Sequence, residues 1–406
     1  MSSSTPSARL PSNTLVLLAT LAVQSLVAMA LLTIPVIAPA VALALNVSPA
    51  LVGLYIAVAY MGAMTASLLS GGLVRRFGAI RCSQAGLALC ALGLGISITP
   101  NPVLAAMGAL LIGLGYGPIT PASSHLLALS TPAHRMSFVF SVKQTGVPLG
   151  GGLAGLIVPS LAEFTSWQSA LGFVAVCCLV CAAVIQPLCK TLDADKDTTR
   201  KLSIRSSLVS PLKLVFSHRP LTVLALLSFM FSISQLSLLT YMVTFLHEDL
   251  SMSLITAGIV LAVAQAAGVA GRMIWGYVAD QYLGSVRMLV VLSLVIGACA
   301  LITPWLGQFD TLLVTLLVLS AFGSSAIGWN GVYLAEVARQ APTGQASLAT
   351  GGTLSMTFLG VVLGPPLFGL IATTLGSYGL AYATLAVPAT LCLFLLWRFG
   401  PAFRKG

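Results

Sequence analysis

Charged residues are scarce in this sequence. Only 7% of its 406 residues are Asp, Glu, Lys or Arg, whereas soluble domains carry about 25%. A chain with so few charges and 58% hydrophobic residues cannot cover a water-exposed surface, so most of it must face lipid. Acidic residues are the rarest, with 9 Asp and Glu against 19 Lys and Arg. In a soluble protein this balance suggests a nucleic-acid partner. Here the cations lie between apolar segments, and we expect no nucleic-acid binding.

The sequence also lacks the residue clusters that metal sites and disulfide frameworks need. Its eight cysteines lie in or beside apolar segments, and the C-x-x-C of Cys178 and Cys181 has no His or acidic residue nearby. Structural zinc needs four convergent ligands, and free cysteine is readily buried as a small apolar residue. We therefore expect no metal, no cofactor and no disulfide. Paired His and acidic residues and an appended soluble domain are missing too, so we expect no enzyme activity.

Long apolar segments are what the sequence has in abundance. A spanning helix needs about 20 mostly apolar residues. Twelve segments qualify: 14–43, 49–73, 82–99, 102–129, 137–160, 167–189, 220–246, 252–279, 286–307, 311–338, 345–374 and 377–398. The first is about twice as long as the core of a signal peptide, so we interpret it as a retained membrane helix. The predicted fold class is an all-α membrane protein with twelve transmembrane helices.

A polar and charged connection divides the twelve segments into two sets of six. The predicted parts are an N-terminus (1–13), a six-helix bundle (14–189), a central loop (190–219), a second six-helix bundle (220–399) and a C-terminus (400–406). With both termini in the cytoplasm, every Lys and Arg outside the spans falls on the inner side, and the outer loops hold acids alone. The sequence thus predicts a multi-pass protein of the cell (inner or plasma) membrane, with the lipid bilayer around it.

The two sets of six repeat each other. GVPLGGGLAGLI at 146–157 and GVVLGPPLFGLI at 360–371 are identical at eight of twelve positions, and each lies on the fifth helix of its half. GGLVRRFG at 71–78 similarly matches GYVADQYLG at 276–284, between the second and third helices. An even number of spans in each half makes the repeats parallel, so a pseudo-twofold axis along the membrane normal relates them.

The loop after the second helix carries the pattern G-x-x-x-R-R-x-G-x-x-R, and the second half has a weaker copy. The first consists of Gly71, Gly72, Arg75, Arg76, Gly78 and Arg81, and the second of Gly276, Asp280, Gly284 and Arg287. With twelve helices in two sixes and a basic central loop, the chain resembles the major facilitator superfamily. The first copy departs from that family in having no acidic residue near Arg75. The resemblance implies secondary transport by alternating access, with helices one, four, seven and ten lining a cavity between the halves.

The eighth helix carries a further resemblance. GRMIWG at 271–276 is similar to the eighth helix of carriers for monocarboxylates and for oxalate and formate. In those carriers, an arginine four residues before the motif glycine contacts the substrate carboxylate, and Arg272 stands at that spacing from Gly276. The fifth helix matches the signature of drug–proton exchangers only in part, because Lys143 and Val147 replace its first two glycines.

Lys143 and Arg272 are the two cations that lie within spans. A charge at the centre of a spanning helix costs about 2.5–3.5 kcal/mol on insertion scales. The repeat has Thr357 and Leu68 at the matching positions, so the duplicated scaffold requires neither charge. In one interpretation, Lys143 extends to the cytoplasmic interface. In the one we favour, both cations hold a carboxylate, Arg in a bidentate manner and Lys as a point charge.

Polar and aromatic side chains on the predicted cavity helices extend this candidate site. They are Gln144 beside Lys143, Gln24 on the first helix, Tyr116 on the fourth, Tyr241 on the seventh, and Trp329, Asn330 and Tyr333 on the tenth. An aromatic wall with an amide, as in Trp329 and Asn330, suits a small planar acid. Such groups often merely pair with a neighbouring helix or their own backbone.

Three functions remain open. The favoured one is a secondary transporter for a small organic anion that works as a monomer. The alternative is a proton-coupled efflux carrier for apolar or drug-like compounds. A carrier for cationic compounds would be expected to have an embedded acid in its first half, and there Glu163 lies in an outer loop. The least favoured is a membrane-embedded sensor or enzyme.

Overall fold

The computed structural model describes residues 13–130, 142–194, 196, 204–309, 311–342, 346–400 and 403, and within these residues all regular structure is helical. The α-helices are α1 (Asn13–Thr33), α2 (Ala38–Leu45), α3 (Val52–Phe77), α4 (Ala79–Ser97), α5 (Pro102–Tyr116), α6 (Ile119–Ser130), α8 (Gly146–Phe164), α9 (Trp167–Val184), α10 (Cys189–Leu192), α11 (Ile204–Ser217), α12 (Arg219–Glu248), α13 (Leu254–Val278), α14 (Ser285–Ile302), α15 (Leu312–Gln340), α16 (Ala346–Leu375), α17 (Tyr378–Ala383) and α18 (Ala386–Phe399). Short 3-10 segments are η1 (Pro35–Ile37), η2 (Pro49–Leu51), η4 (Gln186–Leu188) and η6 (Thr303–Gln308), and η5 (Ala279–Leu283) is a π-helix.

The predicted number of spans is confirmed. The described residues contain 12 helical segments that are long and apolar enough to cross a membrane. Single α-helices make up some of these spans, whereas the first combines α1, η1 and α2 and the fourth combines α5 and α6. Proline explains both interruptions, because Pro35 and Pro118 lack the N–H that a continuous helix needs.

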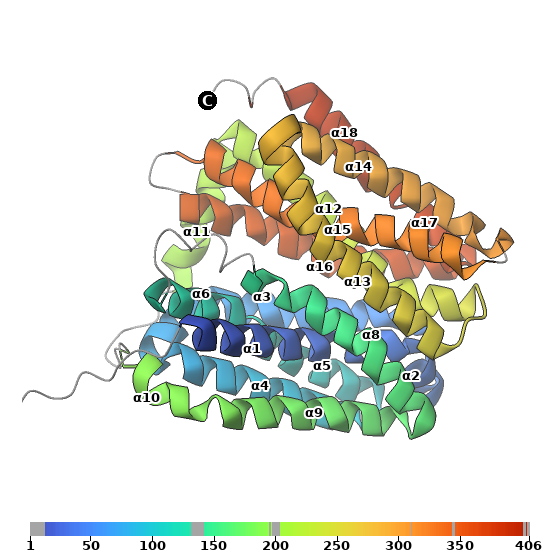
Figure 1. The fold of residues 1–406 in the computed structure, drawn as a ribbon, viewed down its shortest axis with the longest axis horizontal. Coiled ribbons are helices and arrows are strands. Elements are labelled where there is room, and N and C mark those ends of the chain that lie inside the picture. The colour runs from blue at the N-terminus through green and yellow to red at the C-terminus, as the bar shows by residue number, and fades with distance from the viewer. Residues whose placement is uncertain are drawn as a thin grey trace, which may run out of the picture.

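The helices form two bundles that lie side by side (Figure 1). The first, coloured blue to green, holds α1 to α10, and the second, coloured yellow to red, holds α12 to α18. The short helix α11 packs on α16 of the second bundle, where the backbone of Pro211 lies against Gly352. We call the end of the molecule where α1 begins and α18 ends the terminal end. The predicted fold of two six-helix bundles is therefore confirmed.

Most of the contact between the bundles comes from two helix pairs: α8 packs on α13, and α3 packs on α16. Glycine permits the first of these contacts. A Cβ atom added at Gly155 of α8 would lie 2.6 Å from the carbonyl oxygen of Gly258 of α13. Small residues let helices approach closely in a membrane, where van der Waals packing replaces the hydrophobic effect as a driving force. Arg272 lies on α13, and Lys143 lies three residues before α8 begins, so both predicted cations are near this contact between the halves.

Candidate functional site

Lys143 and Arg272 meet at the same residue, Gln144. The ammonium of Lys143 lies 3.4 Å from the side-chain oxygen of Gln144. Arg272, from the opposite half, donates through Nη1 to the main-chain oxygen of Gln144 at 3.0 Å and through Nε to the main-chain oxygen of Ile327 at 3.1 Å. The two cations predicted from sequence thus lie around one short segment at the start of the fifth span.

Neither cation is neutralised within the described part of the chain. The one ion pair found there joins Arg339 to Glu336, at 2.7 Å. Lys143 is 1% exposed, so its side chain does not extend to the surface, and its recorded partner is an uncharged amide. No described residue accepts a hydrogen bond from Nη2 of Arg272. The site therefore holds two positive groups with capacity for an additional acceptor.

Two glutamines with unpaired atoms flank this segment. Gln24 of α1 packs on Gly146 and accepts a hydrogen bond from Thr120 at 3.2 Å, while its Nε2 has no partner among the described residues. Gln265 of α13 lies against Gly151, is 2% exposed, and has no described partner for its Oε1. An unpaired donor and an unpaired acceptor thus belong to glutamines that pack on the first half of α8.

Sequence reasoning did not identify Gln265. It stands seven residues before Arg272, which is about two helical turns, so both side chains lie on one face of α13. That spacing is the signal that could have found it. Tyr116 of α5, which was predicted, is half-buried and packs on Tyr60 with ring centroids 6.0 Å apart.

The predicted aromatic group on the tenth span lies within the second bundle. Trp329 donates from Nε1 to Oε1 of Gln235 at 3.0 Å, and Asn330 donates to the same oxygen at 3.5 Å. Trp329 is fully buried, stacks on Phe231 with centroids 5.1 Å apart, and meets Tyr333 edge-on. Hydrogen bonds to Gln235 of α12 thus connect Trp329 and Asn330 to the seventh span. The Tyr333 hydroxyl has no hydrogen-bond partner among the described residues.

Tyr241 lies at the end of the molecule opposite the terminal end. Its hydroxyl is 2.6 Å from the main-chain oxygen of Ala50 at the start of the second span and 3.0 Å from that of Pro365 on α16. Its single hydrogen is shared between two carbonyls from different halves. Tyr241 therefore connects the two bundles rather than lying beside Lys143.

A carboxylate from a distant part of the chain binds at the first motif loop, which has no acidic residue of its own. Asp193, which follows α10, accepts hydrogen bonds from the backbone N–H groups of Ile80 at 2.8 Å and Arg81 at 3.0 Å. Gly78 has φ of +97°, and a side chain there would collide with Asp193. The Arg81 guanidinium donates to Gln186 at 3.2 Å. Sequence reasoning missed this acid because 112 residues separate Asp193 from Arg81.

The expected loops are shorter than predicted, because the motif residues other than Gly78 and Gly284 lie within the helices on either side. Gly72 and Arg75 lie in α3, where the structure describes their backbone, and Arg76 lies beside the Phe77 ring. In the second copy, a Cβ atom added at Gly276 would find open space. Asp280 and Arg287 are exposed on either side of Gly284. The two copies thus have similar positions between the second and third helices of each half.

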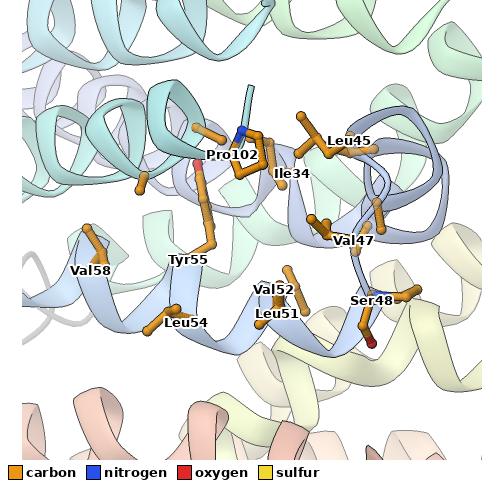
Figure 2. A pocket seen from close by; sticks show the side chains of 16 residues that line it. Ile34, Leu45, Val47, Ser48, Leu51, Val52, Leu54, Tyr55, Val58 and Pro102 are labelled. Atoms are coloured by element: carbon orange, nitrogen blue, oxygen red, sulfur yellow. The ribbon is translucent and has the colours of Figure 1, made fainter. Parts of the chain in front are cut away.

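The described residues contain an apolar pocket of about 170 Å³ at the break in the first span (Figure 2). Side chains such as Ile34, Leu45, Val52 and Pro102 line it, and no charged residue does. This pocket does not suit an anion.

No group of three or more His, Cys, Asp or Glu in the described part of the chain could hold a metal ion.

Comparisons with known proteins agree with this fold. The model of a family described as Major Facilitator Superfamily matches residues 18–353. The chain is 25% identical to the gentisate transporter of Corynebacterium glutamicum over 368 residues, 87% of this chain and 80% of that protein. It is 25% identical to the hexuronate transporter of Bacillus subtilis over 305 residues, 70% of each chain. An uncharacterized MFS-type transporter of Mycobacterium tuberculosis is 24% identical over 275 residues, which cover 68% of this chain and 60% of that protein.

Solved structures share the fold at lower identity. A bacterial homologue of the human lysosomal transporter Spinster, in an inward-facing and occupied conformation, superposes with a TM-score of 0.75 at 15% identity, covering 98% of this chain and 99% of that one. A point mutant of the nucleoside transporter NupG gives a TM-score of 0.77 at 15% identity, with 96% and 100% coverage.

Proposed function

The chain belongs to the major facilitator superfamily of transporters, and we propose that its solute is a small organic anion held between the two halves by Lys143 and Arg272. Transport would proceed by alternating access, with the bound carboxylate shared by one cation from each half. Gln144 would orient both cations, and Gln24 and Tyr116 would line the same site. Trp329, Asn330 and Tyr333 would form its wall towards the second bundle.

The observation that carries the proposal is the buried ammonium of Lys143. A buried charge without a partner costs free energy, and a bound carboxylate removes much of that cost. Lys143 is 1% exposed, and among the described residues its ammonium hydrogen-bonds to the side-chain oxygen of Gln144 alone. Arg272 lies against the main chain of the same residue. An anion is the simplest group that satisfies both side chains at once.

The named relatives support an anionic solute. Gentisate and hexuronates are both hydroxylated carboxylates, and the transporters named for them are 25% identical to this chain. The unpaired Nε2 of Gln24 and Oε1 of Gln265 could serve the hydroxyl groups of such a molecule. A carboxylate bound between α8 and α13 would contact both halves of the protein, as the proposed transport by alternating access requires.

The test is transport by purified protein in proteoliposomes, with radiolabelled gentisate and a hexuronate as probes. Removing one partner of a buried charged contact costs about 2–5 kcal/mol, so Lys143→Gln and Arg272→Gln should each lower kcat/KM by about 30-fold or more. Binding of the same acids should raise the Tm of the wild-type protein but not of Lys143→Gln.

Lys213→Gln is the matched control, because Lys213 is an exposed cation on α11 away from the site. It should transport at the wild-type rate. Normal transport of the carboxylates by both site variants would overturn the assignment of Lys143 and Arg272.

A further inference from the structure

The glycine before α4 and the glycine before α14 share one backbone conformation, although an α-helix precedes the first and a π-helix precedes the second. Gly78 precedes α4 with φ 97° and ψ 155°, and Gly284 precedes α14 with φ 77° and ψ 155°. Each glycine carbonyl accepts a hydrogen bond from the residue four positions later, Cys82 at 3.1 Å and Met288 at 3.0 Å. The third and ninth spans therefore begin in the same way, as two copies of one structural unit.

The two helices differ in what binds their first N–H groups. In α4, the carboxylate of Asp193 accepts from Ile80 and Arg81. The equivalent residues of α14 are Val286 and Arg287, and no described side chain caps this helix. The first copy thus shows that the loop binds an oxyanion, while the second copy has the same donors without one. The positive end of the helix dipole favours an anion there as well.

A cavity of about 630 Å³ occupies this place beside α14. It is lined by Gly284, Ser285, Val286 and Arg287 of the loop and by Arg339 of α15. Nη1 of Arg339 lies 3.4 Å from the Ser285 hydroxyl, so its guanidinium is beside the helix start. Glu336 also lines the cavity.

Glu336 does not neutralise the cavity. One of its oxygens accepts from Arg339 at 2.7 Å and the other from Gln340 at 2.8 Å. Two arginines and one carboxylate leave a net charge of +1 on the lining. The opposite wall is apolar, with Val290, Leu396 and Trp397, and Trp397 is 78% exposed on the outer surface of the bundle.

We propose that this cavity binds a phosphate group, and that an anionic phospholipid supplies it. The tetrahedral phosphate would accept from the Val286 and Arg287 backbone and from the two guanidinium groups. The apolar wall with its exposed Trp397 would contact the glycerol and acyl chains at the membrane interface. This site lies at the terminal end of the second bundle, separate from Lys143 and Arg272, and the proposal does not depend on the transported solute.

Native mass spectrometry of the full-length protein tests the site. The protein is compared in phosphatidylcholine nanodiscs with and without phosphatidylglycerol, and inorganic phosphate is added in a separate arm. An arginine near an anionic membrane surface contributes about 1 kcal/mol, so Arg287→Gln should weaken phosphatidylglycerol binding about fivefold. Ser285→Asp, which adds a carboxylate to the helix start as Asp193 does in the first copy, should abolish it. If Ser285→Asp does not fold, the exposed Arg287 still provides the test.

Arg81→Gln is the matched control, because Arg81 has the equivalent position in the loop that Asp193 already occupies. It should bind phosphatidylglycerol like the wild type. Equal weakening by Arg81→Gln and Arg287→Gln would overturn the proposal, since it would show a general effect of surface charge. Undiminished binding in Arg287→Gln and Ser285→Asp would overturn it too. Binding of inorganic phosphate without phosphatidylglycerol binding would keep the phosphate site and refute its lipid source.

Discussion

At the scale of the residue, Lys143 stands out because no described residue of opposite charge pairs with its ammonium. The repeat has Thr357 at the matching position, and the described neighbours offer Lys143 one amide oxygen. Residues retained for function often lower stability, because the arrangement that binds a ligand is not the one that packs best. If Lys143 is a binding residue, the unliganded protein should be less stable with it than without it.

Lys143→Met tests this trade between stability and function. Replacing buried charges by apolar residues of similar volume often stabilises a protein by about 1–4 kcal/mol. We expect a higher Tm for Lys143→Met without ligand, together with loss of carboxylate binding, measured by thermal unfolding in detergent. Lys213→Met on the exposed face of α11 should leave the Tm unchanged. A fall in Tm for folded Lys143→Met would show that the lysine serves the fold itself.

At the scale of the element, the contact between α8 and α13 depends on glycine. The sequence shows glycines along the fifth helix, and small residues there predict close approach by another helix. The identity of that helix and the meeting point at Gly155 and Gly258 come from the tertiary structure. Similarly, the predicted loop motifs mark where α4 and α14 begin, whereas the acid that binds α4 comes from elsewhere in the chain.

Gly258→Leu should separate α8 from α13. A Cβ atom at Gly258 would collide with the carbonyl oxygen of Gly155, and inserting bulk into a packed contact costs about 1–3 kcal/mol. We expect a lower Tm and loss of transport in proteoliposomes. Gly172→Leu on α9 is the control, because a Cβ atom there would find no atom within 4 Å. Equal behaviour of the two variants would contradict a role for this close approach.

At the scale of the whole molecule, Tyr241 links the two halves at the end opposite the terminal end. It hydrogen-bonds to carbonyls of the second and eleventh spans, which belong to different halves. In the proposed transport by alternating access, such contacts would break when that end opens. The hydroxyl of Tyr382, in contrast, donates to Leu238 at 3.0 Å within one half. Substituting each tyrosine therefore distinguishes contact between the halves, which involves Tyr241, from the stability of one bundle, which involves Tyr382.

Tyr241→Phe should favour opening of that end. A hydrogen bond contributes about 0.5–1.5 kcal/mol, so the ratio of closed to open molecules should fall about two- to tenfold. Distances between spin labels at Leu43 and Thr374, both exposed at that end, measure this ratio. Tyr382→Phe should lower the Tm and leave the ratio unchanged. An unaltered distance distribution in Tyr241→Phe would exclude its role in closure.

By itself, the sequence determined the twelve spans, the duplication and the resemblance to the superfamily. Apolar length and repeated motifs are properties of the linear chain, and a bilayer permits few folds for them. It also marked Lys143 and Arg272, because charges inside spans are costly. The boundaries of the five predicted parts and the cytoplasmic position of both termini stay predictions.

Only the tertiary structure decided which side chains meet. It brought Arg272 to Gln144, placed Gln265 against Gly151, and brought Asp193 to the start of α4. It also turned Tyr241 towards the opposite end of the molecule and tied Trp329 to Gln235. The physical reason is that periodicity defines the face of a helix, whereas its rotation and its neighbours depend on packing between helices distant in sequence.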